Sequence, residues 1–123
     1  MKVYNFPLES NVTLNSSFNS SPMQLYDTYG YFIQATWTGT PNGTFKLQCS
    51  GDPVHPGKVN INPNVPTNWT DIANSSIVVS AAGNYAWNVT SAMYTFVRLV
   101  YTDSSGGTST AILTTVTFNS KGV

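Results

Sequence analysis

The sequence predicts an all-β protein, an antiparallel β-sandwich of jelly-roll type with about eight or nine strands and almost no helix. Serine, threonine and asparagine number 14, 16 and 13 of the 123 residues, and these residues favour strands and turns over helix interiors. Apolar residues recur at a period of two, and no stretch keeps a period of 3.6 over the length of a helix. Short runs separated by turn residues are typical of a sandwich or jelly roll.

The clearest strand covers residues 31–38, where Tyr31, Ile33, Ala35 and Trp37 alternate with more polar residues. The next covers residues 44–50 and directs Phe45, Leu47 and Cys49 to the core by the same alternation. Residues 39–43, Gly-Thr-Pro-Asn-Gly, lie between them and have turn chemistry, so we predict that the two strands form a hairpin.

Residues 51–67 contain four prolines and predict a long excursion without strand structure. Such loops are usually functional or interfacial, and the alternative is a passive cover over one sheet edge. Residues 94–102 are apolar on both faces, as expected for a central strand. The remaining strands are predicted at residues 3–6, 12–14, 69–72, 76–80, 85–90 and 108–119.

The length indicates one domain, with residues 1–28 as an N-terminal arm or edge strands and residues 29–123 as the sandwich. Only 8% of the residues are charged, and five basic residues balance five acidic ones. Nucleic-acid binding is therefore not expected, because it requires a basic surface. No signal peptide or membrane-spanning run is recognisable, so we expect a soluble chain made in the cytoplasm without membrane contact.

The residues needed for catalysis are scarce. The chain has one histidine, one cysteine and one glutamate, and its aspartates are isolated from one another, so we expect no enzyme activity, no cofactor and no metal site. Cys49, Asp52 and His55 are close in sequence, but catalytic groups are normally brought together by the fold, and Cys49 is better interpreted as a core residue. Arg98 is interpreted as a paired structural arginine or as a residue at a subunit boundary.

Three segments together resemble a known class of module: residues 33–48, residues 68–72 (Asn-Trp-Thr-Asp-Ile), and residues 96–101 with the Ser-Gly-Gly-Thr of residues 105–108. Their order and spacing resemble small β-sandwich modules of tailed-bacteriophage structural proteins, including capsid decoration (cement) proteins and head or tail-fibre domains. The resemblance covers roughly residues 29–118. The chain departs from the pattern in a longer loop from Val54 to Pro66.

The resemblance implies a non-enzymatic virion protein on the capsid exterior that binds the assembled head and stabilises it. Its partners would be the major capsid protein and further copies of itself, with a homotrimer favoured. A fibre or host-receptor module that binds carbohydrate is the alternative. An arm would predict that a chain lacking residues 1–21 still folds but no longer joins capsids.

Two parts of the chain are the candidate contact surfaces in this interpretation. Trp37 and Trp87 alternate with polar residues and are expected in the core, which leaves Trp69 as the tryptophan to test for ligand contact. The candidate partner contacts are Val54, His55, Lys58, Asn60, Asn62 and Trp69, with Tyr4, Phe6 and Phe18 in the N-terminal segment.

Overall fold

The computed structural model describes residues 3–25, 28–52 and 66–122, and for residues 3–6, 28, 29, 121 and 122 it describes the backbone alone. The described residues contain strands and no helix, which confirms the predicted fold class. No helix of this part is long and apolar enough to cross a membrane. The strands are β1 (Val3–Thr13), β2 (Phe18–Asn19), β3 (Met23–Gln24), β4 (Thr28–Thr38), β5 (Gly43–Ser50), β6 (Thr70–Asp71), β7 (Ile77–Val79), β8 (Gly83–Val89), β9 (Phe96–Asp103) and β10 (Ile112–Gly122).

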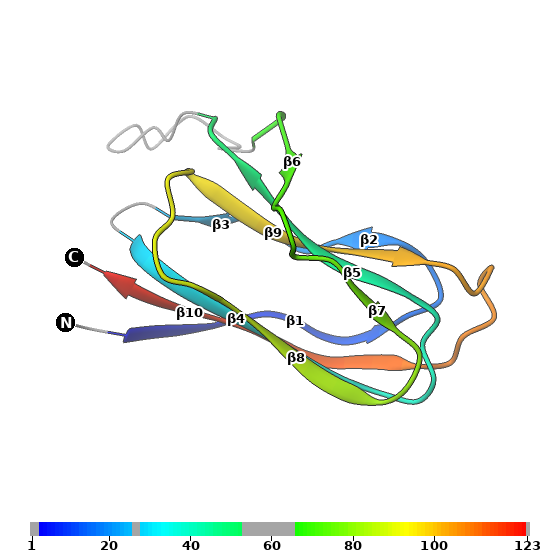
Figure 1. Cartoon of the computed structure of the whole chain (residues 1–123). Helices are drawn as coiled ribbons and strands as arrows, with labels where there is room; N and C mark the ends of the chain where they lie inside the picture. The colour runs from blue at the N-terminus through cyan, green and yellow to red at the C-terminus, as the bar shows by residue number, and fades with distance from the viewer. Residues whose placement is uncertain (1–2, 26–27, 53–65, 123) are drawn as a thin grey trace, which may run out of the picture.

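The strands form two antiparallel sheets that face each other (Figure 1). Sheet A has the order β1-β10-β4-β8. Sheet B has β9 and β5 at its centre, with β2 and β3 on the free side of β9 and β6 and β7 on the free side of β5. If each pair of short strands is counted as one edge strand, each sheet has four positions, and the order is that of an eight-stranded jelly roll. The structure adds β2 and β3, which were not predicted, whereas the strands predicted at residues 3–6 and 12–14 form the single strand β1.

The core lies between the sheets and is formed by the alternating residues that the sequence indicated. Tyr31, Ile33, Ala35 and Trp37 of β4 are all buried, as predicted. The Trp37 ring packs on Phe45 with centroids 5.3 Å apart. Both tryptophans expected in the core are there, because Trp37 is 6% exposed and Trp87 is 7% exposed.

The predicted hairpin between residues 31–38 and 44–50 is wrong. β4 pairs with β10 and β8 in sheet A, whereas β5 pairs with β9, β6 and β7 in sheet B. The turn after Gly39, which has a φ of 81°, therefore carries the chain from one sheet to the other. Alternation shows only that each strand has one apolar face, and two such faces meet equally well across a core or side by side in one sheet.

The N-terminal segment is built into both sheets of its own chain. β1 is one strand where two were predicted, and it pairs along β10 from Val3↔Lys121 to Thr13↔Ile112. β2 and β3 both pair with β9. Leu14, between β1 and β2, is completely buried and its amide donates to the carbonyl of Ala111 over 2.8 Å. Removal of residues 1–21 would therefore take away an edge strand and part of the core.

Candidate functional site

The outer face of sheet B carries the main cluster of charged side chains among the described residues. β5 and β9 pair so that Gln48 lies opposite Arg98. Phe45 and Leu47 point into the core, so the intervening Lys46 and Gln48 point outward by alternation. On β9, Arg98 lies between the buried Val97 and Leu99 and points outward for the same reason.

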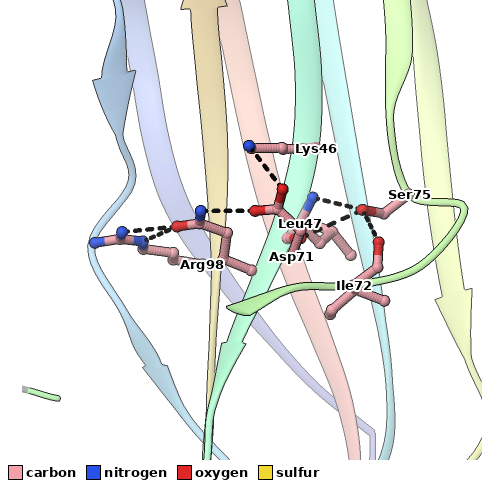
Figure 2. A network of polar contacts seen from close by, with 7 residues as sticks. Lys46, Leu47, Asp71, Ile72, Ser75 and Arg98 are labelled. Atoms are coloured by element: carbon pink, nitrogen blue, oxygen red, sulfur yellow. Dashed lines mark hydrogen bonds and ion pairs between the residues drawn. The ribbon is translucent and has the colours of Figure 1, made fainter. Parts of the chain in front are cut away.

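Four polar side chains form a connected network on this face (Figure 2). Arg98 donates to Gln48 Oε1 from Nε (2.9 Å) and from Nη2 (2.7 Å). Gln48 Nε2 donates to Asp71 Oδ1 over 2.8 Å, and Lys46 Nζ forms an ion pair with Asp71 Oδ2 at 3.0 Å. The Gln48 amide therefore connects the arginine to the carboxylate. Two cations and one carboxylate give the network a formal charge of +1.

The electrostatics of the network follow from these bonds. Donation by Gln48 and by Lys46 lowers the pKa of Asp71, so that this carboxyl is ionised at neutral pH. Partial burial lowers the pKa of Arg98 from its high ordinary value. An arginine keeps its charge under such a shift, because its ordinary pKa is above about 12. The network therefore remains net positive over the physiological range.

Trp69 lies beside the network and is held by two contacts. The guanidinium carbon of Arg98 lies 4.1 Å from the centroid of the indole ring, a cation–π geometry. The indole Nε1 donates to the carbonyl of Pro66 over 3.2 Å. Trp69 is half-buried, and the ring face under Arg98 is already occupied.

Asp52 holds together the two described ends between which residues 53–65 run. Its Oδ2 accepts hydrogen bonds from the amides of Thr67 (2.6 Å) and Asn68 (3.0 Å), and its Oδ1 accepts one from Asn68 Nδ2 (3.0 Å). These bonds, with the Asn68 side chain as the largest contribution, lower the pKa of Asp52. From the other side, Thr95 Oγ1 donates to the Ser50 carbonyl over 3.0 Å. Asp52 therefore holds in place the two residues that directly precede Trp69, Thr67 and Asn68.

The Cys49 thiol and the Asp52 carboxylate, which lie close to His55 in sequence, are each constrained by their surroundings. Burial raises the pKa of Cys49, which disfavours the reactive thiolate, and the Asp52 carboxylate is occupied by Thr67 and Asn68. Cys49 is half-buried and lies outside the buried core cluster, which differs from the core position predicted for it. His55 lies outside the described residues. Within residues 3–25, 28–52 and 66–122, no three His, Cys, Asp or Glu side chains gather as metal ligands would.

The predicted contact residues have different positions. Val54, His55, Lys58, Asn60 and Asn62 lie outside the described residues. Tyr4 and Phe6 belong to β1, opposite Ser120 and Phe118 of β10, and their side chains are not described. Phe18 packs on the core beside Tyr101, with ring centroids 6.0 Å apart. Among the side chains that are described, Trp69 alone of this set lies on the network.

Sequence reasoning missed the combination of Lys46, Gln48 and Asp71 with Arg98. The alternation in residues 44–50 did direct Lys46 and Gln48 outward. Their position beside Arg98 depends on the pairing of β5 with β9. Gln48 and Arg98 are 50 residues apart in the chain, and no local sequence pattern indicates that their strands pair. Arg98 was interpreted as a paired structural arginine, and its guanidinium donates to a neutral amide, that of Gln48.

No protein-family model matches the chain, and a search of curated proteins found no match. The class of protein is thus defined by its architecture. It is an antiparallel jelly-roll β-sandwich whose outer sheet face carries a net-positive network of arginine, lysine, amide and carboxylate beside a half-buried tryptophan.

Proposed function

We propose that this chain is a non-enzymatic structural protein of a virion, a capsid decoration protein that binds the assembled head and stabilises it. The jelly roll supports this proposal, since viral capsid proteins are among the main users of that fold. So does the resemblance of residues 29–118 to phage structural modules. In this proposal the main charged cluster is the binding surface, and its lysine and aspartate are already joined in an ion pair.

The observation that carries the proposal is the pre-organised pair of Arg98 and Trp69. Arginine and tryptophan are enriched at the energetic centres of protein interfaces. Here Gln48 and the indole ring already fix the guanidinium, so little side-chain entropy remains to be lost on binding. The formal charge of +1 suits a carboxylate-bearing surface of the capsid protein.

Decoration would stabilise the head by linkage. A protein that binds the assembled shell and not the free subunits stabilises the shell in proportion to its occupancy. At a concentration 100 times Kd, the gain is about 2.7 kcal/mol per site. No catalytic step is required, and the protein acts from the capsid exterior.

The experiment is cosedimentation of the isolated protein with virions and with empty capsids, measured at increasing protein concentration. We expect saturation at a copy number that matches a class of capsid site. The Trp69→Ala and Arg98→Gln variants should bind at least several-fold more weakly, because each removes one member of the pair. Thr115→Ala, an exposed position on the outer face of sheet A, is the matched control. Absence of saturable binding by the wild-type protein would overturn the proposal.

A fibre or host-receptor module that binds carbohydrate is the second candidate. Lectins also use jelly rolls, and an aromatic ring beside amide and carboxylate groups is a typical sugar contact. Against it, Trp37 and Trp87 are buried and Arg98 covers one face of Trp69. Millimolar sugar binding that is lost in Trp69→Ala, without capsid binding, would favour this candidate.

A further inference from the structure

Most edges of the two sheets carry features that prevent pairing with another strand. β1 contains Pro7, a register shift between Pro7 and Glu9, and Asn11 in a left-handed conformation with a φ of 54°. β2, β3, β6 and β7 are only two or three residues long. Short strands, prolines, bulges and charges are the usual means by which sheet edges avoid association.

β8, the other edge of sheet A, has none of these features. Its seven residues pair with β4 in an unbroken register from Tyr31↔Val89 to Trp37↔Gly83. It contains no proline and no charged residue. Of the strands that the structure describes, β4 alone pairs with it, so the second side of its backbone is open for hydrogen bonding. Tyr85, at this edge, is 41% exposed although it is aromatic.

The surroundings of β8 are also uncharged. No Asp, Glu, Lys, Arg or His occurs from Ile72 to Val97, a stretch that includes β7, β8 and the connection between them. Val78 on β7 is 84% exposed, and β7 forms the edge of sheet B on the side where β8 forms the edge of sheet A (Figure 1). Two copies of this side can approach without electrostatic repulsion, whereas a charged partner would gain nothing there.

We propose that β8 is the edge through which two copies of this chain associate, by antiparallel β8–β8 pairing about a twofold axis at Ala86. Ala86 is the central residue of β8, so this register sets Asn84 opposite Asn88 and Tyr85 opposite Trp87 of the second copy. An isologous contact of this kind closes on itself. It joins the two copies of sheet A into one continuous eight-stranded sheet. The proposal goes beyond the proposed function and is independent of capsid binding, and it assigns a dimer where the resemblance implied a homotrimer.

The register also assigns a face to each pair. Asn84, Ala86 and Asn88 lie opposite Thr36, Gln34 and Phe32 of β4, which alternate with buried residues. The three β8 positions are therefore on the outer face of the sheet, and both asparagines are exposed. Charges introduced there would meet their counterparts in the second copy without entering the core.

The test measures the mass of the isolated full-length protein by sedimentation equilibrium over a range of concentrations. We expect a reversible monomer–dimer equilibrium. Ala86→Lys sets two lysines opposite each other and should weaken association by about tenfold or more. Ser10→Lys, the same charge at an exposed position on the opposite edge of sheet A, should leave it unchanged. A wild-type monomer at every concentration, or a trimer insensitive to Ala86→Lys, would overturn the proposal.

Charge reversal keeps the test decisive if Ala86→Lys fails to fold. N84K/N88K and N84D/N88D should each be monomeric alone and should form a mixed dimer together. N84K/N88D should remain a dimer by itself, because antiparallel pairing sets each introduced lysine opposite an introduced aspartate. Equal masses for all three double variants would refute β8 pairing. If the wild-type protein forms the dimer but does not bind capsids, that result would count against the proposed function alone.

Discussion

Replacing Tyr101 with phenylalanine is expected to make this protein more stable, although it removes a polar group from the centre of the core. Tyr101 is completely buried between Phe18 and Phe45, with ring centroids 6.0 and 4.8 Å away. Its hydroxyl has no hydrogen-bond partner among the described residues. The hydroxyl is directed at the backbone of Gly43, where an added Cβ would come within 2.5 Å of it.

The size of the effect follows from two opposing terms. A buried hydroxyl without a partner costs about 1–3 kcal/mol relative to its hydration in the unfolded chain. Removing the oxygen leaves a small void, which costs roughly a few tenths of a kcal/mol because the loss of stability grows with the volume of the cavity. We therefore expect Tyr101→Phe to raise the free energy of unfolding by about 1–2 kcal/mol, since the desolvation term is larger.

The assay is urea denaturation of the wild-type protein and the variant, with thermal unfolding as a second measure. An increase of 1 kcal/mol corresponds to roughly 4 °C in Tm for a chain of this size. Tyr31→Phe is the matched control, because Tyr31 is also buried but its hydroxyl is hydrogen-bonded to that of Tyr94. The control should lose about 1 kcal/mol. A loss of similar size in Tyr101→Phe would refute the reasoning, because it would mean that the Tyr101 hydroxyl has a partner.

Three further predictions concern the backbone, pH and the N-terminal segment. Gly43→Ala should destabilise by about 3 kcal/mol or more in denaturant titration, because the new Cβ would lie 2.4 Å from the carbonyl of Thr102; a loss below 1 kcal/mol would contradict this. The pKa of Asp52 is lowered on folding, so its contribution is complete above its unfolded pKa and is lost as the pH falls below about 4. Stability measured from pH 7 to 3 should therefore fall less steeply in Asp52→Asn, and identical slopes would exclude this role. Deletion of residues 1–21 should abolish cooperative unfolding seen by circular dichroism, because it removes β1 and the buried Leu14, whereas a detachable arm would leave the transition intact.

The sequence by itself determined the fold class and most of the core. Tyr31, Ile33, Ala35 and Trp37 alternate so regularly that one face of their strand could only be buried, and the structure confirms it. Val97, Leu99 and Tyr101 alternate along the central strand predicted at residues 94–102, and all three have no exposed surface. These core assignments depend only on local periodicity, which can be read directly from the sequence.

Strand partners were decided by the tertiary structure. The turn at residues 39–43 has hairpin chemistry, yet it connects the two sheets, and the Trp37 ring packs on Phe45 across the core. In the same way, Gln48 meets Arg98 because β5 lies beside β9. The open side of β8 also exists only because no other described strand pairs there. Each of these depends on contacts between residues far apart in the chain, and periodicity carries no information about them.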